Sequence, residues 1–271
     1  MKSFATTGHV ALHVTLGGGE VTVEASAEPN VEIDLVPLRD NEATRQAIAE
    51  ARIQITNRGD GHEIIVQLQK KSGFVVGRGA KVGVRVRCPR GSDLELRCGS
   101  ANLDATGTLG KVDVKSASGD VSIEDVKRLE VNTASGDLRV RDVEQALGCR
   151  TASGDVAVRR CLGPITAHLV SGDLLVGEAA AGLTVITVSG DVRFDAAGGG
   201  GMQVQSVSGD VYLAIKEGER LYIDASSVSG TMSSDLAVGD VPANDGGAVY
   251  DVRVRTVSGD LQIARAATVT A

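Results

Sequence analysis

Short runs of alternating apolar and polar residues fill the C-terminal two-thirds of the chain. One such run follows Asp120, and its apolar positions are Val121, Ile123, Val126, Leu129 and Val131. Alternation with a period of two is typical of strands with one buried face, and the three-residue step from Ile123 to Val126 indicates a corner. Each run therefore predicts a short strand, a corner, a second strand and a turn.

The turn carries the tripeptide Ser-Gly-Asp, which becomes Ser-Gly-Thr once. The copies begin at Ser118, Ser135, Ser153, Ser171, Ser189, Ser208, Ser229 and Ser258, with spacings of 17, 18, 18, 18, 19, 21 and 29 residues. A degenerate copy at Ser100 makes nine. Units this short cannot bury their own apolar face, so neighbouring copies must stack and share a core.

The repeats predict an all-β fold, a parallel β-helix-like solenoid of about nine coils of about 18 residues. An antiparallel arrangement, in which each repeat is a hairpin of a twisted or rolled sheet, fits the same pattern. The nearly constant period favours the solenoid, because stacked coils bring identical residues into ladders with a spacing of about 4.8 Å.

The glycine and aspartate of each turn are the candidate site residues, with a structural role. Glycine supplies a positive φ, and the carboxylate can accept backbone N–H groups of the turn. Calcium bound along the column of carboxylates is the alternative, but calcium-binding nonapeptide arrays have a different period and glycine pattern. No metal and no cofactor is therefore predicted. The turn residues are Gly119, Asp120, Gly136, Asp137, Gly154, Asp155, Gly172, Asp173, Gly190, Asp191, Gly209, Asp210, Gly259 and Asp260.

Residues 1–97 show the same pattern in weaker form and predict an N-terminal β region that caps the stack. Residues 98–271 form the repeat region, continuous with the first as one structural unit. A short helix is predicted over residues 41–51, with Asp40 as its N-cap. The face expected to pack inward carries Ala43, Ala47, Ile48 and Ala51.

Three other segments of the chain interrupt the repeat pattern. A hairpin is predicted from Ile53 to Leu68, and the Arg58-Gly59-Asp60 triplet in its turn, although it spells an integrin-binding motif, is interpreted as a turn only. The Gly-containing loop from Lys70 to Lys81 lacks the Lys-Ser/Thr ending of a P-loop. The segment from Asp235 to Gly247 is predicted to leave the stack and is a candidate for ligand contact.

The amino-acid composition restricts which side chains can form the core and which partners the chain can bind. Hydrophobic residues make up 42% of the 271 residues but aromatic residues only 2%, so small aliphatic side chains must build the core. The net charge of −7 argues against nucleic acid or an anionic membrane as the main partner. With no signal peptide and no apolar run long enough to span a bilayer, the chain is predicted to be cytoplasmic.

The sequence contains no recognisable catalytic or metal-binding motif. The four cysteines lack metal-ligand spacing and are predicted to be buried free thiols. The four histidines, which are His9, His13, His62 and His168, do not show zinc-like spacing either. Without a catalytic motif the chain is predicted not to be an enzyme. A carbohydrate-active β-helix enzyme is the third reading, and it would need a groove in which acidic and basic side chains cluster.

The N-terminal pattern and the repeats together resemble the toast-rack family. The similarity lies in Val10-Ala11-Leu12-His13-Val14, in Gly18-Gly19-Glu20-Val21-Thr22-Val23, in the helical insert, in Val82 to Gly91 and in the train of Ser-Gly-Asp repeats. These bacterial β-strand-repeat domains, common in actinobacteria, are called putative adhesins and have no known function. The resemblance implies a stacked β-solenoid-like fold, no known catalytic activity and frequent association with envelope-stress systems.

The leading expectation is a non-enzymatic scaffold that binds a protein partner or another copy of itself. Self-association is expected because the last residues after Ile263 are a weak cap for an open strand edge. A peripheral link to a membrane stress protein follows from the resemblance, whereas nucleic acid and a direct membrane span are not expected. The alternative is a surface adhesin or envelope binder of peptides or lipids, although the anchor and export signal frequent in the family are not seen.

Overall fold

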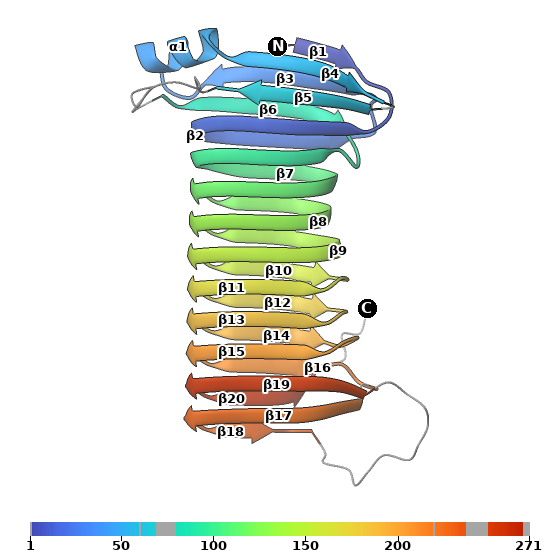
Figure 1. Cartoon of the computed structure of the whole chain (residues 1–271), viewed down its shortest axis with the longest axis vertical. Helices are drawn as coiled ribbons and strands as arrows, with labels where there is room; N and C mark the ends of the chain where they lie inside the picture. Colours follow the sequence, from blue (N-terminus) through green and yellow to red (C-terminus); the bar gives the residue numbers. More distant parts are fainter. Residues whose placement is uncertain (1, 60, 69–79, 219, 237–248, 268–271) are drawn as a thin grey trace. The chain divides into compact units, whose positions relative to one another are not determined.

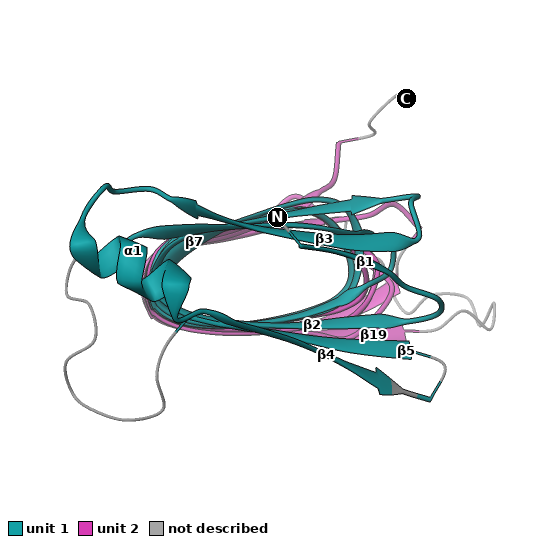
Figure 2. Ribbon diagram, turned by 90° about the horizontal axis from the view of Figure 1, so that it is seen from above, with its two compact units in different colours: residues 1–141 teal, residues 142–271 magenta. Residues whose placement is uncertain are grey.

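The computed structural model describes residues 2–59, 61–68, 80–218, 220–236 and 249–267, and these residues are almost entirely β-strand with one short helix. The chain divides into two compact units, residues 1–141 and residues 142–271, which are coloured separately in Figure 2. The division at residue 97 and the single continuous unit expected from the sequence stay predictions.

The second unit is a stack of parallel strands (Figure 1). Its strands are β9 (Leu138–Ser153, which begins in the first unit), β10 (Val156–Cys161), β11 (Ile165–Ser171), β12 (Leu174–Ala179), β13 (Leu183–Ser189), β14 (Val192–Ala197), β15 (Met202–Ser208), β16 (Val211–Ile215), β17 (Arg220–Ser229), β18 (Met232–Ser234), β19 (Val249–Ser258) and β20 (Leu261–Arg265). Each repeat supplies one strand to each of two columns.

Equivalent residues of successive repeats pair directly. In the first column Val185 pairs with Val204 and Ser189 with Ser208, and all the pairings between β9, β11, β13, β15, β19 and β17 are parallel. In the second column β10, β12, β14, β16, β20 and β18 pair in the same way. The parallel β-solenoid prediction is therefore confirmed, and the hairpin alternative is wrong.

The order of the coils differs from the order of the sequence at the end of this unit. Strand β19 lies between β15 and β17, and β20 lies between β16 and β18 (Figure 1). The repeat that begins at Ser229 is thus the last coil, and the repeat that begins at Ser258 is inserted before it. Strand β20, which precedes the C-terminal tail, therefore does not end the stack; among the described residues the β17–β18 coil forms this end.

The first unit combines solenoid coils with antiparallel strands. Its elements are β1 (Lys2–Ala5), β2 (Val10–Ser26), β3 (Asn30–Pro37), α1 (Glu42–Ala49), β4 (Arg52–Arg58), β5 (Gly61–Gln67), β6 (Val82–Pro89), β7 (Asp93–Ser118) and β8 (Val121–Ser135). The long β2 pairs in parallel with β5 and β6 on one side and with β7 on the other. Strand β7 then pairs in parallel with β8.

Antiparallel strands cover the β5–β6 side of this unit. Strand β4 pairs with β5 as the predicted hairpin, with Arg58 opposite Gly61. Strand β3 pairs with β6, and β1 pairs with β3. Asp60 of the Arg-Gly-Asp triplet, residues 70–79 of the predicted loop, residues 237–247 of the predicted excursion and residues 268–271 of the tail lie outside the described residues.

Helix α1 is shorter than predicted and has a different N-cap. The side chain of Asn41, not that of Asp40, accepts the N–H of Thr44 at 2.8 Å, while Asp40 forms an ion pair with Arg45. This satisfies one of the free N–H groups of the first turn. The Thr44 hydroxyl is buried and accepts the N–H of Lys81 at 3.1 Å, which ties the helix to the chain before β6.

The inward rows of the strands form an aliphatic core. Phe194 is the largest fully buried side chain, and it lies in a ladder between Val176 and Leu213. All four cysteines lie in the described residues and are thiols. Three are buried, whereas Cys98 is only partly so, and burial raises the pKa of Cys88 and Cys161 to about 11.

Candidate functional site

The Ser-Gly-Asp turn brings successive backbones into close contact. Gly172 has a φ of +122°, and a Cβ placed on it would lie 2.3 Å from the carbonyl oxygen of Gly154 in the neighbouring coil. Gly190 has the same geometry against Gly172, at 2.1 Å. Both the positive φ and the contact exclude a side chain at this position. Glycine is therefore required by the spacing of the coils as well as by the turn.

Most of the turn carboxylates accept a backbone N–H group of the next coil. In the second unit the N–H of Asp173 donates to Oδ1 of Asp155 at 2.9 Å, and the N–H of Asp191 donates to Oδ1 of Asp173 at 2.8 Å. The column continues through Asp210 and Asp260, both at 2.8 Å. Charge-assisted acceptance of an N–H group satisfies one oxygen of the carboxylates of Asp155, Asp173, Asp191 and Asp210.

The first unit contains the start of an equivalent column. The N–H of Asp120 donates to Oδ1 of Asn102 at 3.0 Å, and the N–H of Asp137 donates to Oδ1 of Asp120 at 3.0 Å. Asn102 belongs to the degenerate repeat at Ser100. Its amide oxygen replaces the carboxylate oxygen as an acceptor, so the degenerate copy keeps the contact.

The single Ser-Gly-Thr copy lies where the column ends. The N–H of Thr231 donates to Oδ1 of Asp260 at 2.7 Å, and Thr231 belongs to the β17–β18 coil that terminates the stack. Among the described residues, no further coil follows whose N–H group would need a carboxylate acceptor. The departure from aspartate thus marks the terminal coil.

A second set of hydrogen bonds lies inside several of the turns. The hydroxyl of Thr133 donates to the carbonyl of Ser135 at 2.8 Å, and the hydroxyl of Thr151 donates to that of Ser153 at 3.0 Å. The same contact recurs at Thr187 and Thr256. These mostly buried hydroxyls satisfy backbone carbonyls at the corner of the core.

The aspartate column predicts a difference between two substitutions of Asp173. Asp173→Asn keeps an oxygen acceptor for the N–H of Asp191, as Asn102 does naturally, so the free energy of unfolding should fall by less than about 0.5 kcal/mol. Asp173→Ala removes the acceptor and should lower it by about 1–2 kcal/mol. Denaturant titration of both variants measures the difference, and equal losses would contradict the assigned role.

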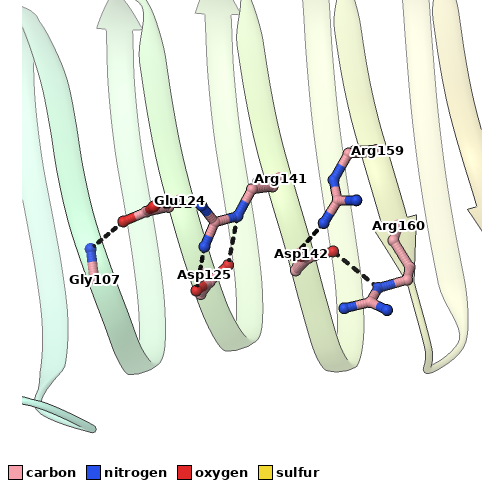
Figure 3. Close-up of polar contacts among 7 residues, drawn as sticks. All are labelled: Gly107, Glu124, Asp125, Arg141, Asp142, Arg159 and Arg160. Carbon is pink, nitrogen blue, oxygen red and sulfur yellow. Dashed lines mark hydrogen bonds and ion pairs between the residues drawn. The ribbon is translucent and has the colours of Figure 1, made fainter.

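Ion pairs lie at the other corner of the coils, between the two strands of a repeat and away from the Ser-Gly-Asp turn (Figure 3). In the first unit, Oε2 of Glu124 accepts the N–H of Gly107 at 2.6 Å, which lowers the pKa of Glu124. Arg141 binds Asp125 in a bidentate manner, with N–O distances of 3.0 Å and 2.6 Å, and also contacts Glu124. These hydrogen bonds raise the pKa of Arg141.

The second unit carries its own acidic corner. Oδ2 of Asp142 accepts from Arg159 at 2.6 Å, and Oδ1 accepts from Arg160 at 2.9 Å (Figure 3). Burial on its own raises the pKa of Asp142, but the two guanidinium groups outweigh it and hold the pKa below its usual value. Sequence reasoning missed these ion pairs. Asp142 and Arg160 occupy the same position in successive repeats, and this alternation of acidic and basic residues could have predicted a contact between neighbouring coils.

The lowered pKa of Asp142 predicts a pH-dependent contribution to stability. The carboxylate stabilises the fold fully above its unfolded pKa of about 3.9, and this contribution is lost as the pH falls through the lower folded pKa. Asp142→Asn should therefore cost about 1 kcal/mol at pH 7, and the difference from the wild type should vanish in acid. Asp251→Asn, at a more exposed ion pair with Arg253, is the control and should change little.

A hollow on the first unit gathers acidic and basic side chains. Its volume is about 260 Å³, and it is lined by Thr22, Glu24, Glu32, Asp34, Arg85, Val86 and Arg87. Nε of Arg87 donates to Glu24 at 2.9 Å, and Nη1 lies 3.8 Å from Glu32. The hollow has the charges that a carbohydrate-active enzyme would need, but Arg87 forms ion pairs with two of its three carboxylates.

Two of the four histidines, His9 and His13, lie beside carboxylates. Nδ1 of His13 lies 2.7 Å from Glu95, and its Nε2 lies 3.3 Å from Glu63. Burial raises the pKa of Glu95, but hydrogen bonds with His13 and Arg97 outweigh it and lower the pKa overall. No group of His, Cys, Asp or Glu side chains within the described ranges has an arrangement that could hold a metal ion.

An exposed valine column runs along one face of the second unit. It consists of the residues that precede the turn serine in five repeats, which are, in stacking order, Val170, Val188, Val207, Val257 and Val228. The first four are 47–53% exposed, and Val228 in the terminal coil is 83% exposed. Single exposed apolar residues are common, but an in-register column of five is a continuous apolar stripe.

Within the described residues, no helix is long and apolar enough to cross a bilayer.

None of the curated proteins matches the chain. A putative adhesin from Parabacteroides distasonis has a similar structure, with a TM-score of 0.53, 13% identity and coverage of 96% of each chain. A putative adhesin from Bacteroides fragilis gives a TM-score of 0.45 and 9% identity, covering 96% of this chain and 95% of that one.

A putative cell adhesion protein from Clostridium sporogenes gives a TM-score of 0.28 and 12% identity, covering 97% of this chain and 99% of that one. At these identities the similarity concerns the fold alone. The family model described as Toastrack DUF4097 matches residues 9–264, which is nearly the whole chain. The chain therefore belongs to the Toastrack DUF4097 family.

Proposed function

We propose that the chain is a non-enzymatic interaction module that binds another protein through the valine column. The observation that carries this proposal is the half-exposed stripe from Val170 to Val228, which leaves apolar surface on a regular sheet face. A stripe of this kind is more typical of a protein-binding surface than of a site for a small polar ligand. The names of the similar proteins, putative adhesins, are consistent with such a role.

The partner proposed for this surface is a protein that presents apolar side chains and a negative charge. Val257 is flanked on the same outer face by Arg255 and Arg253, both more than half exposed. Burial of the valines would supply binding free energy, and the arginines would favour an acidic neighbour. Family membership makes a regulator of the envelope-stress response one candidate for this partner.

The test compares two substitutions on the outer face of β15. Val207→Glu places a charge in the valine column, whereas Gln203→Glu places the same charge at an exposed position of the same strand. Tagged protein is recovered from its host, and bound proteins are identified by mass spectrometry in soluble and membrane fractions. Val207→Glu should reduce recovery of the partner by about tenfold or more, and Gln203→Glu should not.

The outcomes of this experiment separate the proposed roles. Recovery of a membrane stress regulator that depends on Val207 supports the envelope-stress role, and recovery of a soluble protein with the same dependence supports a scaffold. Equal recovery with both variants would contradict binding through the valine column. Circular dichroism of each variant confirms that the fold is retained.

We propose the cytoplasm as the compartment of the chain. All four cysteines are thiols, which suits a reducing environment, and burial raises the pKa of Cys88 and Cys161 to about 11, which keeps them unreactive. Fractionation of host cells tests this proposal. Detection on the cell surface would instead favour the alternative, a surface adhesin or envelope binder of peptides or lipids.

A further inference from the structure

The terminal coil of the second unit has an edge that no strand of the described residues pairs with. Strand β17 pairs with β19 on one side, and β18 pairs with β20, but no strand within the described residues pairs with the other edge of either. An open edge presents a row of N–H and C=O groups that can pair with another chain. The first unit differs, because antiparallel strands β4 and β3 cover β5 and β6.

The core is also open at this coil. Met232 is 53% exposed, although its paired neighbour Leu261, at the same inward position, is only 2% exposed. In β17 the inward-facing Ile223 and Ala225 are partly exposed, whereas Val252 and Val254, the residues of β19 that pair with them, are fully buried. An added strand would bury apolar side chains as well as satisfy backbone groups.

The sequence of β17 is complementary to itself in one direction. If two β17 strands pair antiparallel with Tyr222 on the two-fold axis, Arg220 of each strand faces Asp224 of the other. Leu221 then faces Ile223 on the inward side. Parallel pairing in register would instead place Arg220 against Arg220 and Asp224 against Asp224, and like charges directly opposite one another are destabilising.

Arg220 has a further feature that fits this arrangement. Its Nε atom is buried and has no hydrogen-bond partner among the described residues. Asp224 is about half exposed, and its nearest cation, Arg255, lies 3.9 Å away. When a second β17 strand pairs with this edge, Arg220 of each strand can therefore form an ion pair with Asp224 of the other across the two-fold axis.

We propose that two copies of this chain associate through their β17 edges, antiparallel about a two-fold axis at Tyr222. This inference goes beyond the proposed function, because it concerns the β17 edge and not the valine column. The interface is isologous, so each copy contributes the same residues and the assembly closes as a dimer. Of the valine column only Val228 belongs to β17, so the other four valines of a dimer could still bind another protein.

The test places a cysteine on the proposed axis in the full chain. In Tyr222→Cys the two thiols lie across one strand pair, within reach of a short bis-maleimide. In Val228→Cys, the control on the same outer face, the two thiols are separated by twelve residues along the strands, or about 40 Å. Wild-type protein controls for the native cysteines, of which Cys98 is only partly buried.

The expected result is a concentration-dependent, about twofold rise in mass by sedimentation and a crosslinked dimer with Tyr222→Cys only. Ile223→Lys, which puts a charge at the edge, should return the protein to a monomer. A wild type that stays monomeric at every concentration, or equal crosslinking at 222 and 228, would overturn the proposal.

Protection of the Tyr222→Cys thiol from maleimide in a monomer would also overturn it, because another segment of the chain would then cover the edge. The result is independent of the valine column. Dimer formation together with unchanged partner recovery in Val207→Glu would contradict the proposed function only, and the reverse pattern would contradict the dimer only.

Discussion

Replacement of Gly172 by alanine is expected to lower the free energy of unfolding of the second unit by about 4 kcal/mol or more. The φ of +122° strains any residue with a Cβ, and that Cβ would lie 2.3 Å from the carbonyl oxygen of Gly154. Because the clash is with backbone, the two coils must separate, and their hydrogen bonds and the aspartate contact are lost together. Denaturant titration followed by far-UV circular dichroism measures the loss.

The control for this substitution is Gly218→Ala. Gly218 also has a positive φ, of +84°, but no atom lies within 4 Å of the position its Cβ would occupy. The loss of unfolding free energy in Gly218→Ala therefore measures the strain of the backbone conformation alone, which is about 1–2 kcal/mol. If the two variants lost the same stability, the close approach of the coils would not be the reason that the turn requires glycine.

Replacement of Phe194 by alanine is expected to cost about 3–5 kcal/mol, because it leaves a cavity in the middle of the core. Phe194 is fully buried, and its neighbours along the ladder are Val176 and Leu213, whose backbones are held in register by parallel pairing. The strands cannot close around the missing ring without breaking that register. Thermal and denaturant unfolding measure the effect.

Two further variants separate the cavity from a general loss of apolar surface. Phe194→Leu keeps most of the volume and should cost about 1–2 kcal/mol. Leu175→Ala removes an apolar side chain on β12 that is 43% exposed and should cost about 1 kcal/mol or less. A small loss in Phe194→Ala would mean that this part of the stack can collapse, contrary to a rigid ladder.

The terminal coil shows how much of the assembly follows from the repeats and how much does not. Every repeat carries the same apolar pattern and the same turn, so the edge of any coil can accept almost any other coil. The position of β19 between β15 and β17 therefore could not be read from the repeat pattern. The signals were the 29-residue interval between Ser229 and Ser258 and the change of aspartate to Thr231.

The role of the turn residues likewise follows only in part from the sequence. Glycine and aspartate at each turn were predicted to serve the local backbone, because positive φ and carboxylate acceptors are local properties of a turn. The acceptor role of Asp173 is instead directed to Asp191 in the next coil. A contact between residues 18 positions apart depends on the stacking distance, which the composition of a single turn does not specify.

The sequence by itself determined the all-β class, the aliphatic core and the short helix, because periodicity and turn chemistry are local and repeated; it favoured parallel stacking of the repeats over hairpins but left both arrangements open. The tertiary structure alone decided the order of the coils, the corner ion pairs of Asp142, the exposed valine column and the edge of β17 that no described strand pairs with. These features depend on which surfaces meet after stacking, and near-identical repeats leave that choice to long-range contacts and to the few residues that differ.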